Sequence, residues 1–180
     1  MLSKITLIGY RATGKSSVAK CLSELMDIPT IDTDAAIEER SGKTIARIFS
    51  EDGEPYFRDL EADVVAELLA APESLIVATG GGAPMREETR RLMKSRSLVF
   101  WLTASVETIA RRMTGDADTA SRRPSLTESR SPVDEIATVL AAREPFYREA
   151  ATFVVDTENK TVQEVCDEIY KLSRADFACR

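Results

Sequence analysis

The clearest chemistry in this sequence lies in the segment GYRATGKS, residues 9–16, which fits the phosphate-binding pattern G-x-x-x-x-G-K-[ST]. In such a loop the backbone N–H groups surround phosphate oxygens, and the N-terminus of the following helix adds a partial positive charge. Lys15 would reach the β- and γ-phosphates, and the hydroxyl of Ser16 would face Mg²⁺. The pattern therefore predicts a site for a nucleoside triphosphate.

The neighbouring sequence favours this interpretation over an accidental glycine-rich turn. Residues 5–8 form a short apolar run that is typical of a buried strand, and residues 17–26 have the pattern of a helix. A strand, the loop and a helix in this order are the context that the phosphate-binding pattern requires.

Two aspartates, Asp32 and Asp34, follow the next strand-like segment. An enzyme with this loop needs an acidic residue near Mg²⁺, and the third strand-like segment ends in glycines instead. We expect one carboxylate to serve the metal and the other to face an acceptor hydroxyl. The alternative for Asp34 is a purely structural role as a helix N-cap.

Three consecutive glycines, Gly80, Gly81 and Gly82, follow an apolar run that is typical of a buried strand. Because they lack side chains, a ligand or another backbone can come close, and their amides can donate to an oxygen-rich ligand. The alternative is a tight turn, which alone rarely needs three glycines. We therefore expect a ligand near this turn.

Two arginines are candidates for binding an anionic group. Arg58 lies at the start of a long predicted helix, and Arg143 lies where Pro145 is expected to interrupt another helix. A guanidinium can hold a carboxylate or phosphate through two parallel hydrogen bonds. Taken singly, each is more typical of a solvated or salt-bridged surface arginine.

The segment 114–124 is polar and interrupted by Gly115 and Pro124, so regular structure is not expected there. It brings Arg122 and Arg123 into the chain close to a phosphate site. We interpret it as a mobile lid, with a solvated surface loop as the alternative.

The composition bounds the function. A chain of 180 residues is expected to form one domain with one core, and the net charge of −6 argues against general affinity for nucleic acid. No apolar stretch approaches the ~20 residues of a membrane span and no signal peptide is recognised, so we expect a cytoplasmic location. The absence of histidine excludes a Ser-His-Asp triad, a histidine-ligated zinc and a histidine base.

Apolar strand-like runs alternate with helical patterns, which predicts an α/β fold with a parallel sheet that binds ligands at the carboxyl ends of its strands. The predicted strands are Ile5–Ile8, Thr30–Asp32, Leu75–Thr79, Leu98–Leu102 and Phe153–Val155. The predicted helices are Lys15–Met26, Asp34–Ser41, Ile45–Ser50, Glu54–Ala71, Arg86–Lys94, Val106–Met113, Val133–Glu149 and Thr161–Arg174.

These motifs together resemble the shikimate kinase family over essentially the whole chain. The family transfers the γ-phosphoryl group of ATP to the 3-hydroxyl of shikimate, in the pathway to aromatic amino acids. The resemblance implies a three-layer P-loop fold of the nucleoside-monophosphate-kinase type, with a five-stranded parallel sheet flanked by helices in a single domain, 1–180. It also implies a helical substrate-binding segment near 33–61 and a mobile lid near 112–127. The matching motifs are residues 9–16, Asp32-Thr33-Asp34, Phe57-Arg58, Gly80-Gly81-Gly82, Arg123-Pro124 and the segment REPFYR at 143–148.

The resemblance also implies roles for individual residues. Asp34 would bind the shikimate hydroxyls and could accept the proton, while Asp32 and Ser16 would hold Mg²⁺. An adenine-stacking arginine is implied at Arg111 or Arg112, between which spacing does not choose; we assign Arg112. The implied catalytic residues are Lys15, Asp34 and Arg123, and the implied shikimate-binding residues are Asp34, Arg58, Gly80, Gly81, Gly82 and Arg143. The nucleotide-binding residues are Gly9, Arg11, Ala12, Thr13, Gly14, Lys15, Ser16, Ser17, Arg112 and Arg123.

The expected partners are therefore ATP and shikimate, with Mg²⁺, and no nucleic acid or membrane; we expect a monomer. Two rival hypotheses are another kinase of this architecture, such as a gluconate or nucleoside-monophosphate kinase, and a non-catalytic nucleotide-dependent switch. An aspartate facing hydroxyls disfavours a phosphate acceptor. A switch would have no use for the acceptor residues Asp34, Arg58 and Arg143.

Overall fold

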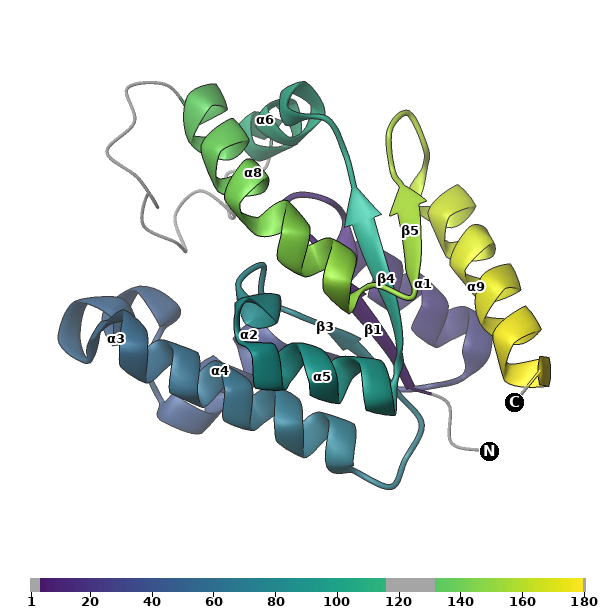
Figure 1. The fold of residues 1–180 in the computed structure, drawn as a ribbon, viewed down its shortest axis with the longest axis horizontal. Coiled ribbons are helices and arrows are strands. Elements are labelled where there is room, and N and C mark those ends of the chain that lie inside the picture. Colours follow the sequence, from purple (N-terminus) through teal and green to yellow (C-terminus); the bar gives the residue numbers. More distant parts are fainter. Residues whose placement is uncertain (1–3, 116–131, 180) are drawn as a thin grey trace.

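Five short apolar segments form the parallel sheet that organises this structure, a computed structural model that describes residues 4–115 and 132–179 (Figure 1). The strands lie in the order β2-β3-β1-β4-β5, and every pair of neighbours is parallel. The predicted α/β fold is confirmed. The strands are β1 (Lys4–Ile8), β2 (Thr30–Asp32), β3 (Leu75–Ala78), β4 (Leu98–Thr103) and β5 (Phe153–Asp156).

The helices follow the predicted ones closely, with three differences. The α6 helix continues past Met113 to Gly115, into the segment where no regular structure was expected, and α9 continues past Arg174 to Cys179. A short 3₁₀ turn, η1, was not predicted. The helices are α1 (Lys15–Met26), α2 (Thr33–Ser41), α3 (Ile45–Glu51), α4 (Gly53–Ala70), α5 (Glu87–Arg96), α6 (Val106–Gly115), α8 (Pro132–Ala150) and α9 (Val162–Cys179), and η1 is Ala83–Met85.

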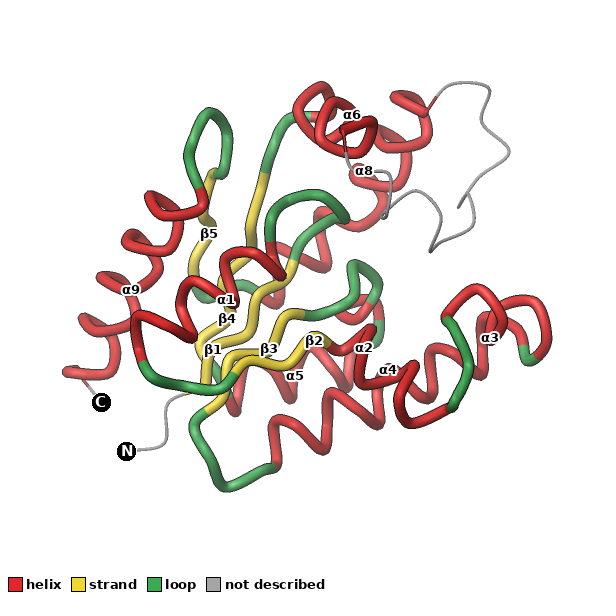
Figure 2. Tube along the Cα trace, turned by 180° about the vertical axis from the view of Figure 1, so that it is seen from behind, coloured by secondary structure: helices red, strands yellow, loops and turns green. Residues whose placement is uncertain are grey.

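Alternate residues of each strand face opposite sides of the sheet, so each side forms its own core. One side packs against α1 and α9, which lie side by side in Figure 2. The other side packs against α4, α5 and α8. The strand residues on the first side include Ile5, Leu7, Ile76, Phe100 and Val155, and those on the second include Ile8, Val77, Val99 and Trp101.

Two smaller apolar clusters lie beyond the carboxyl ends of the strands. One joins α2, α3 and the first half of α4, which together cover the predicted substrate-binding segment 33–61. The other joins α6 and α8 around the ring of Tyr10, a residue of the phosphate-binding loop. The loop is therefore packed against the two helices on either side of the predicted lid.

The expectation that Pro145 interrupts a helix is wrong, because α8 runs from Pro132 to Ala150 with the proline inside it. A proline has no N–H for the carbonyl four residues earlier, here that of Ala141. Ala141 is exposed, so water can replace the missing donor. The following turn contains Tyr147 and Ala150, and burial of both side chains holds it against the sheet.

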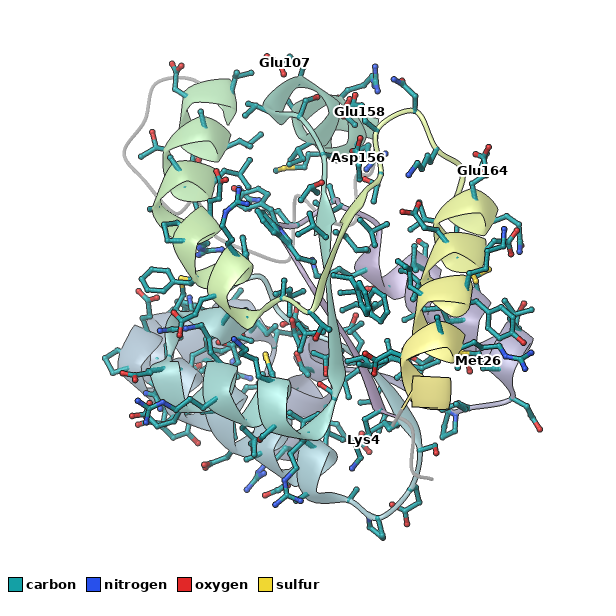
Figure 3. The ribbon with its side chains drawn as sticks, turned by 45° about the vertical axis from the view of Figure 1, so that its right-hand side comes forward. Lys4, Met26, Glu107, Asp156, Glu158 and Glu164 are labelled. Carbon is teal, nitrogen blue, oxygen red and sulfur yellow. The ribbon has the colours of Figure 1, made fainter. Side chains whose placement is uncertain are left out.

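The C-terminal end of α4 is closed by a lysine from the first strand. The ammonium of Lys4 donates to the carbonyl oxygens of Leu68 and Leu69, at 3.2 and 2.9 Å, and also to that of Ala71. These are carbonyls that a helix end leaves without a partner. Burial lowers the pKa of Lys4. Lys4 lies at the opposite end of the sheet from Asp156 and Glu158 (Figure 3).

None of the helices in the described ranges is long and apolar enough to cross a lipid bilayer.

Replacing Lys4 with methionine should lower the free energy of unfolding by about 1–3 kcal/mol, because buried carbonyls lose their donor. Urea denaturation followed by circular dichroism measures this loss. The matched control is Lys94→Met on the exposed surface of α5, which should stay within about 0.5 kcal/mol of the parent. Equal stability of the two variants would contradict the role of Lys4.

Candidate active site

The phosphate-binding loop connects β1, the central strand, to α1. Gly9 has a φ of 140°, and a Cβ there would lie 2.5 Å from the carbonyl oxygen of Leu102, so only glycine fits. Ala12 also has a positive φ, 61°, which costs a non-glycine residue conformational energy. The hydroxyl of Thr13 donates to the carbonyl oxygen of Tyr10 at 2.8 Å and fixes the turn.

The side chain of Lys15 folds back over this loop. Its ammonium donates to the carbonyl oxygens of Gly9 and Tyr10, at 2.9 and 2.8 Å. A cation held in this place lies beside the N-terminus of α1, where a phosphate is favoured by the helix dipole. The phosphate-binding role of Lys15 stays a prediction, and the structure places its ammonium at the loop where that role requires it.

Ser16 and Asp32 meet across the carboxyl ends of β1 and β2. The Ser16 hydroxyl donates to Asp32 Oδ2 at 2.7 Å. Both are hard oxygen donors, as Mg²⁺ prefers, and Ser16 is exposed beside the phosphate-binding loop. The structure thus brings together the two residues predicted to bind the metal. Ser17, also assigned to the nucleotide, is exposed in the same first turn of α1.

The alternative role of Asp34 as a helix N-cap is wrong, because the N-cap of α2 is Asp32. The other oxygen of Asp32, Oδ1, accepts from the backbone N–H of Asp34 at 3.0 Å. Asp34 itself lies in the first turn of α2, half-buried. One short contact therefore fixes the position of Asp34 relative to the predicted metal ligand.

The glycine turn after β3 is held from both sides. The N–H of Gly80 donates to Thr33 Oγ1 at 2.9 Å, which ties the turn to the start of α2. The carbonyl oxygen of Gly81 accepts from the Tyr147 hydroxyl at 2.6 Å and from Arg143 Nη1 at 3.3 Å. The turn is tight as well, since the N–H of Ala83 reaches the Gly80 carbonyl at 3.2 Å.

The absence of a side chain at Gly82 leaves room for the guanidinium of Arg58. A Cβ on Gly82 would lie 2.0 Å from Arg58 Nη1. The same Nη1 donates to Glu61 Oε2 at 2.7 Å, and the Nη2 and Nε of Arg58 reach Glu54 Oε1 at 3.0 and 3.2 Å. Arg58 is therefore held in place before any substrate binds.

Glu61 is a buried carboxylate, with 4% of its side chain exposed. Burial raises its pKa above the ordinary value, although the charges of Arg58, Arg143 and Arg86 pull it down. Glu61 is hydrogen-bonded to Arg58 and its charge attracts Arg143, which offsets part of the repulsion between these two predicted shikimate-binding arginines.

Tyr147 reaches the site from α8, as Arg143 does. Burial raises the pKa of Tyr147 to about 12, so its hydroxyl stays protonated near neutral pH and donates to Gly81. Arg143 is one turn earlier on the same helix, which explains why both reach one carbonyl.

Of the two arginines considered for adenine, the structure places Arg112 at the nucleotide loop. Arg112 Nη1 approaches the carbonyl oxygen of Ala12 at 3.4 Å and Thr157 Oγ1 at 3.0 Å, and its Nη2 donates to the Thr157 carbonyl at 2.8 Å. Arg111 is exposed and reaches Thr108 Oγ1 at 2.9 Å.

The side chain of Arg11 lies over the ring of Tyr10, 5.6 Å from its centroid, and reaches α8. It forms an ion pair with Glu135 at 3.2 Å, and both side chains are largely buried. Arg11 therefore joins the loop to the helix that carries Arg143. Arg123 and the residues of the predicted lid from 116 onward lie outside the described residues.

Sequence reasoning missed Glu61 and Tyr147 and gave Thr33 no role of its own. Glu61 has one readable signal, its spacing of three residues from Arg58 on a predicted helix. Thr33 and Tyr147 lie inside motifs already singled out, but their buried hydrogen bonds depend on distant parts of the chain.

A parallel sheet in this order, with the phosphate-binding loop after its central strand, is the fold of a P-loop kinase. A family model described as shikimate kinase matches residues 11–173. The chain belongs to the shikimate kinase family.

Individual relatives agree with this assignment. The chain is 39% identical to a shikimate kinase of Rhodopirellula baltica over 165 residues, covering 92% of this chain and 87% of that protein. It is 32% identical to that of Dictyoglomus turgidum over 176 residues, covering 98% and 100%. The structure of the Acinetobacter baumannii shikimate kinase in complex with shikimate superimposes with a TM-score of 0.89, at 32% identity, covering 98% of this chain and 95% of that one. A gluconokinase of Sinorhizobium meliloti, at 18% identity and a TM-score of 0.56 over 97% and 95% of the two chains, shares the fold alone.

Substituting alanine for Gly82 should move the Arg58 guanidinium while leaving the backbone intact, since the clash is with the end of a flexible side chain. We expect the KM for shikimate to rise about tenfold or more, with the KM for ATP little changed. Steady-state kinetics measures both constants.

If this effect acts through Arg58, it should nearly vanish in an Arg58→Ala background. Full additivity of the two substitutions would show that Gly82 acts by another route.

Proposed function

We propose that the residues described above carry out transfer of the γ-phosphoryl group of ATP to the 3-hydroxyl of shikimate. The observation that carries the proposal is that the phosphate-binding loop and the residues proposed to bind shikimate lie close together. A Cβ on Gly81 would lie 3.3 Å from the carbonyl oxygen of Gly9 and 3.4 Å from Arg143 Nη1. The phosphate-binding loop and an anion-binding guanidinium thus meet at one glycine, as transfer between two bound molecules requires.

Arg58 and Arg143 are the groups that would hold the shikimate carboxylate. Both guanidinium groups lie against the glycine turn, from α4 and from α8. Guanidinium groups bind carboxylates in a defined plane, which would orient the ring and direct one hydroxyl toward the phosphate-binding loop. Orientation is the main contribution that a protein makes to phosphoryl transfer.

On the nucleotide side, Lys15 would leave the loop carbonyls for the β- and γ-phosphates. The oxygens of Ser16 and Asp32 fit Mg²⁺, and we propose that they hold it, Asp32 directly or through water. When bound, the metal ion neutralises charge on the phosphates. Arg112 would pack on the adenine, and Arg123 would reach the phosphates from the lid.

Asp34 would bind the acceptor hydroxyls and take the proton that is released. Its backbone N–H donates to Asp32, the proposed metal ligand, so one short segment would serve both reactants. In a loose transition state the hydroxyl keeps its proton until late, so the main work of Asp34 would be to orient it.

The family assignment favours shikimate over gluconate or a nucleoside monophosphate as acceptor, and the built acceptor side disfavours a non-catalytic switch. All proposed ligands of both substrates lie in one chain, which supports action as a monomer. A cytoplasmic location agrees with the use of ATP and remains part of the proposal.

The first experiment is ADP release from Mg²⁺-ATP with shikimate, compared with gluconate, AMP and no acceptor. Release that depends on shikimate alone is the expected result. Release of ADP with gluconate or AMP, or release that needs no acceptor, would overturn the acceptor assignment of Asp34, Arg58 and Arg143.

In the same assay, Lys15→Met should reduce kcat by at least about 100-fold, a loss of about 3 kcal/mol, because a charge that stabilises the transferring group is removed. Circular dichroism would show that the fold is kept. Near-normal turnover would contradict the role of Lys15.

The metal assignment has its own test. Asp32→Asn should raise the Mg²⁺ concentration for half-maximal activity about tenfold or more, because a neutral amide binds a hard cation less well than a carboxylate. An unchanged Mg²⁺ dependence would remove Asp32 from the metal site.

A further inference from the structure

Arg90 is a buried arginine that none of the steps above uses. Its side chain is only 8% exposed, although it lies on α5, which supplies no group to the site. A buried guanidinium needs polar partners to offset its lost hydration. Arg90 Nη1 donates to the carbonyl oxygens of Pro84 and Met85 at 2.8 and 3.0 Å, and its Nε donates to Glu149 Oε2 at 2.9 Å.

These partners belong to the two segments that carry the acceptor ligands. Pro84 and Met85 belong to η1, which directly follows the glycine turn, and the N–H of Met85 donates back to the Gly82 carbonyl at 2.9 Å. Glu149 lies on α8, and the Arg90 guanidinium also stacks 4.8 Å from the ring centroid of Phe146 on that helix. Arg90 therefore joins η1 to α8.

The same two segments meet a second time at the site itself. There, Arg143 Nη1 lies 3.3 Å from the Gly81 carbonyl and the Tyr147 hydroxyl lies 2.6 Å from it. On binding, Arg143 has to serve the substrate as well. The distance between α8 and the glycine turn then depends on the contacts that do not face the substrate, and Arg90 supplies three of them.

We propose that Arg90 is a positioning residue for the acceptor site: by joining η1 to α8, it sets where Arg143 stands relative to the Gly80–Gly82 turn. It acts through these groups and does not touch the substrate. The inference rests on the proposed roles of Arg143 and the glycine turn in binding shikimate. A residue that only stabilised the fold would lower the melting temperature without separating the two substrates.

The test compares Arg90→Met with Arg91→Met. Methionine keeps much of the buried stem and removes the donors. Arg91, the next residue on α5, is 76% exposed and pairs with Glu87 on the same helix, so it is the matched control. For Arg90→Met we expect the KM for shikimate to rise about tenfold or more, while the KM for ATP changes less than about twofold. Arg91→Met should leave both constants unchanged.

A second variant keeps the inference testable if Arg90→Met does not fold. Glu149→Ala removes one partner at a half-exposed position and should raise the KM for shikimate about threefold, again without a matching change for ATP. Unchanged constants in a folded Arg90→Met enzyme, or an equal rise in both, would overturn the inference. A parent enzyme whose ADP release ignores shikimate would instead overturn the proposed function.

Discussion

The central position of β1 in the parallel sheet is the constraint on which the site depends. With β3 beside it and β2 beyond, the carboxyl ends of three strands come next to one another, and each delivers a different group. The loop after β1 provides the phosphate site, β2 ends in Asp32, and β3 leads into the glycine turn. Two short hydrogen bonds, Ser16 to Asp32 at 2.7 Å and Gly80 to Thr33 at 2.9 Å, lock the three loops together. The order of the strands therefore determines where the site lies, and the helices adjust the positions of its side chains.

Buried charged groups contribute much to the positions of these side chains. Burying a carboxylate such as Glu61 is unfavourable, as its raised pKa shows, and the fold compensates by surrounding it with guanidinium groups. Glu61 and Glu54 hold Arg58 before substrate arrives, so the Arg58 side chain would lose little conformational freedom on binding. In the proposed function, an incoming carboxylate would therefore meet an arginine that is already oriented and already partly neutralised.

Features that depend on a few neighbouring residues could be predicted from the sequence. The phosphate-binding loop and the sheet itself follow from a short motif and from the alternation of apolar runs, whereas the choice of Asp32 over Asp34 as the partner of Ser16 came from the family resemblance. Glu61 and Tyr147 could not be assigned because their roles come from burial against segments far away in the chain. The interruption expected at Pro145 was wrong for the same reason, since burial of Tyr147 and Ala150 keeps the helix going. The hydrogen bond that positions Asp34 could not be predicted either, because only the structure shows that Asp32 is the N-cap of α2.

The two halves of α8, before and after Pro145, have different contacts. The half before it is attached to the phosphate-binding loop through Glu135 and the cluster around Tyr10. The half after it is attached to the glycine turn and to α5 through Tyr147 and Glu149. A helix that lacks one main-chain hydrogen bond bends most easily at that turn. The α8 helix is clamped on both sides of this turn, because Arg143 before Pro145 and Tyr147 after it both donate to the carbonyl oxygen of Gly81.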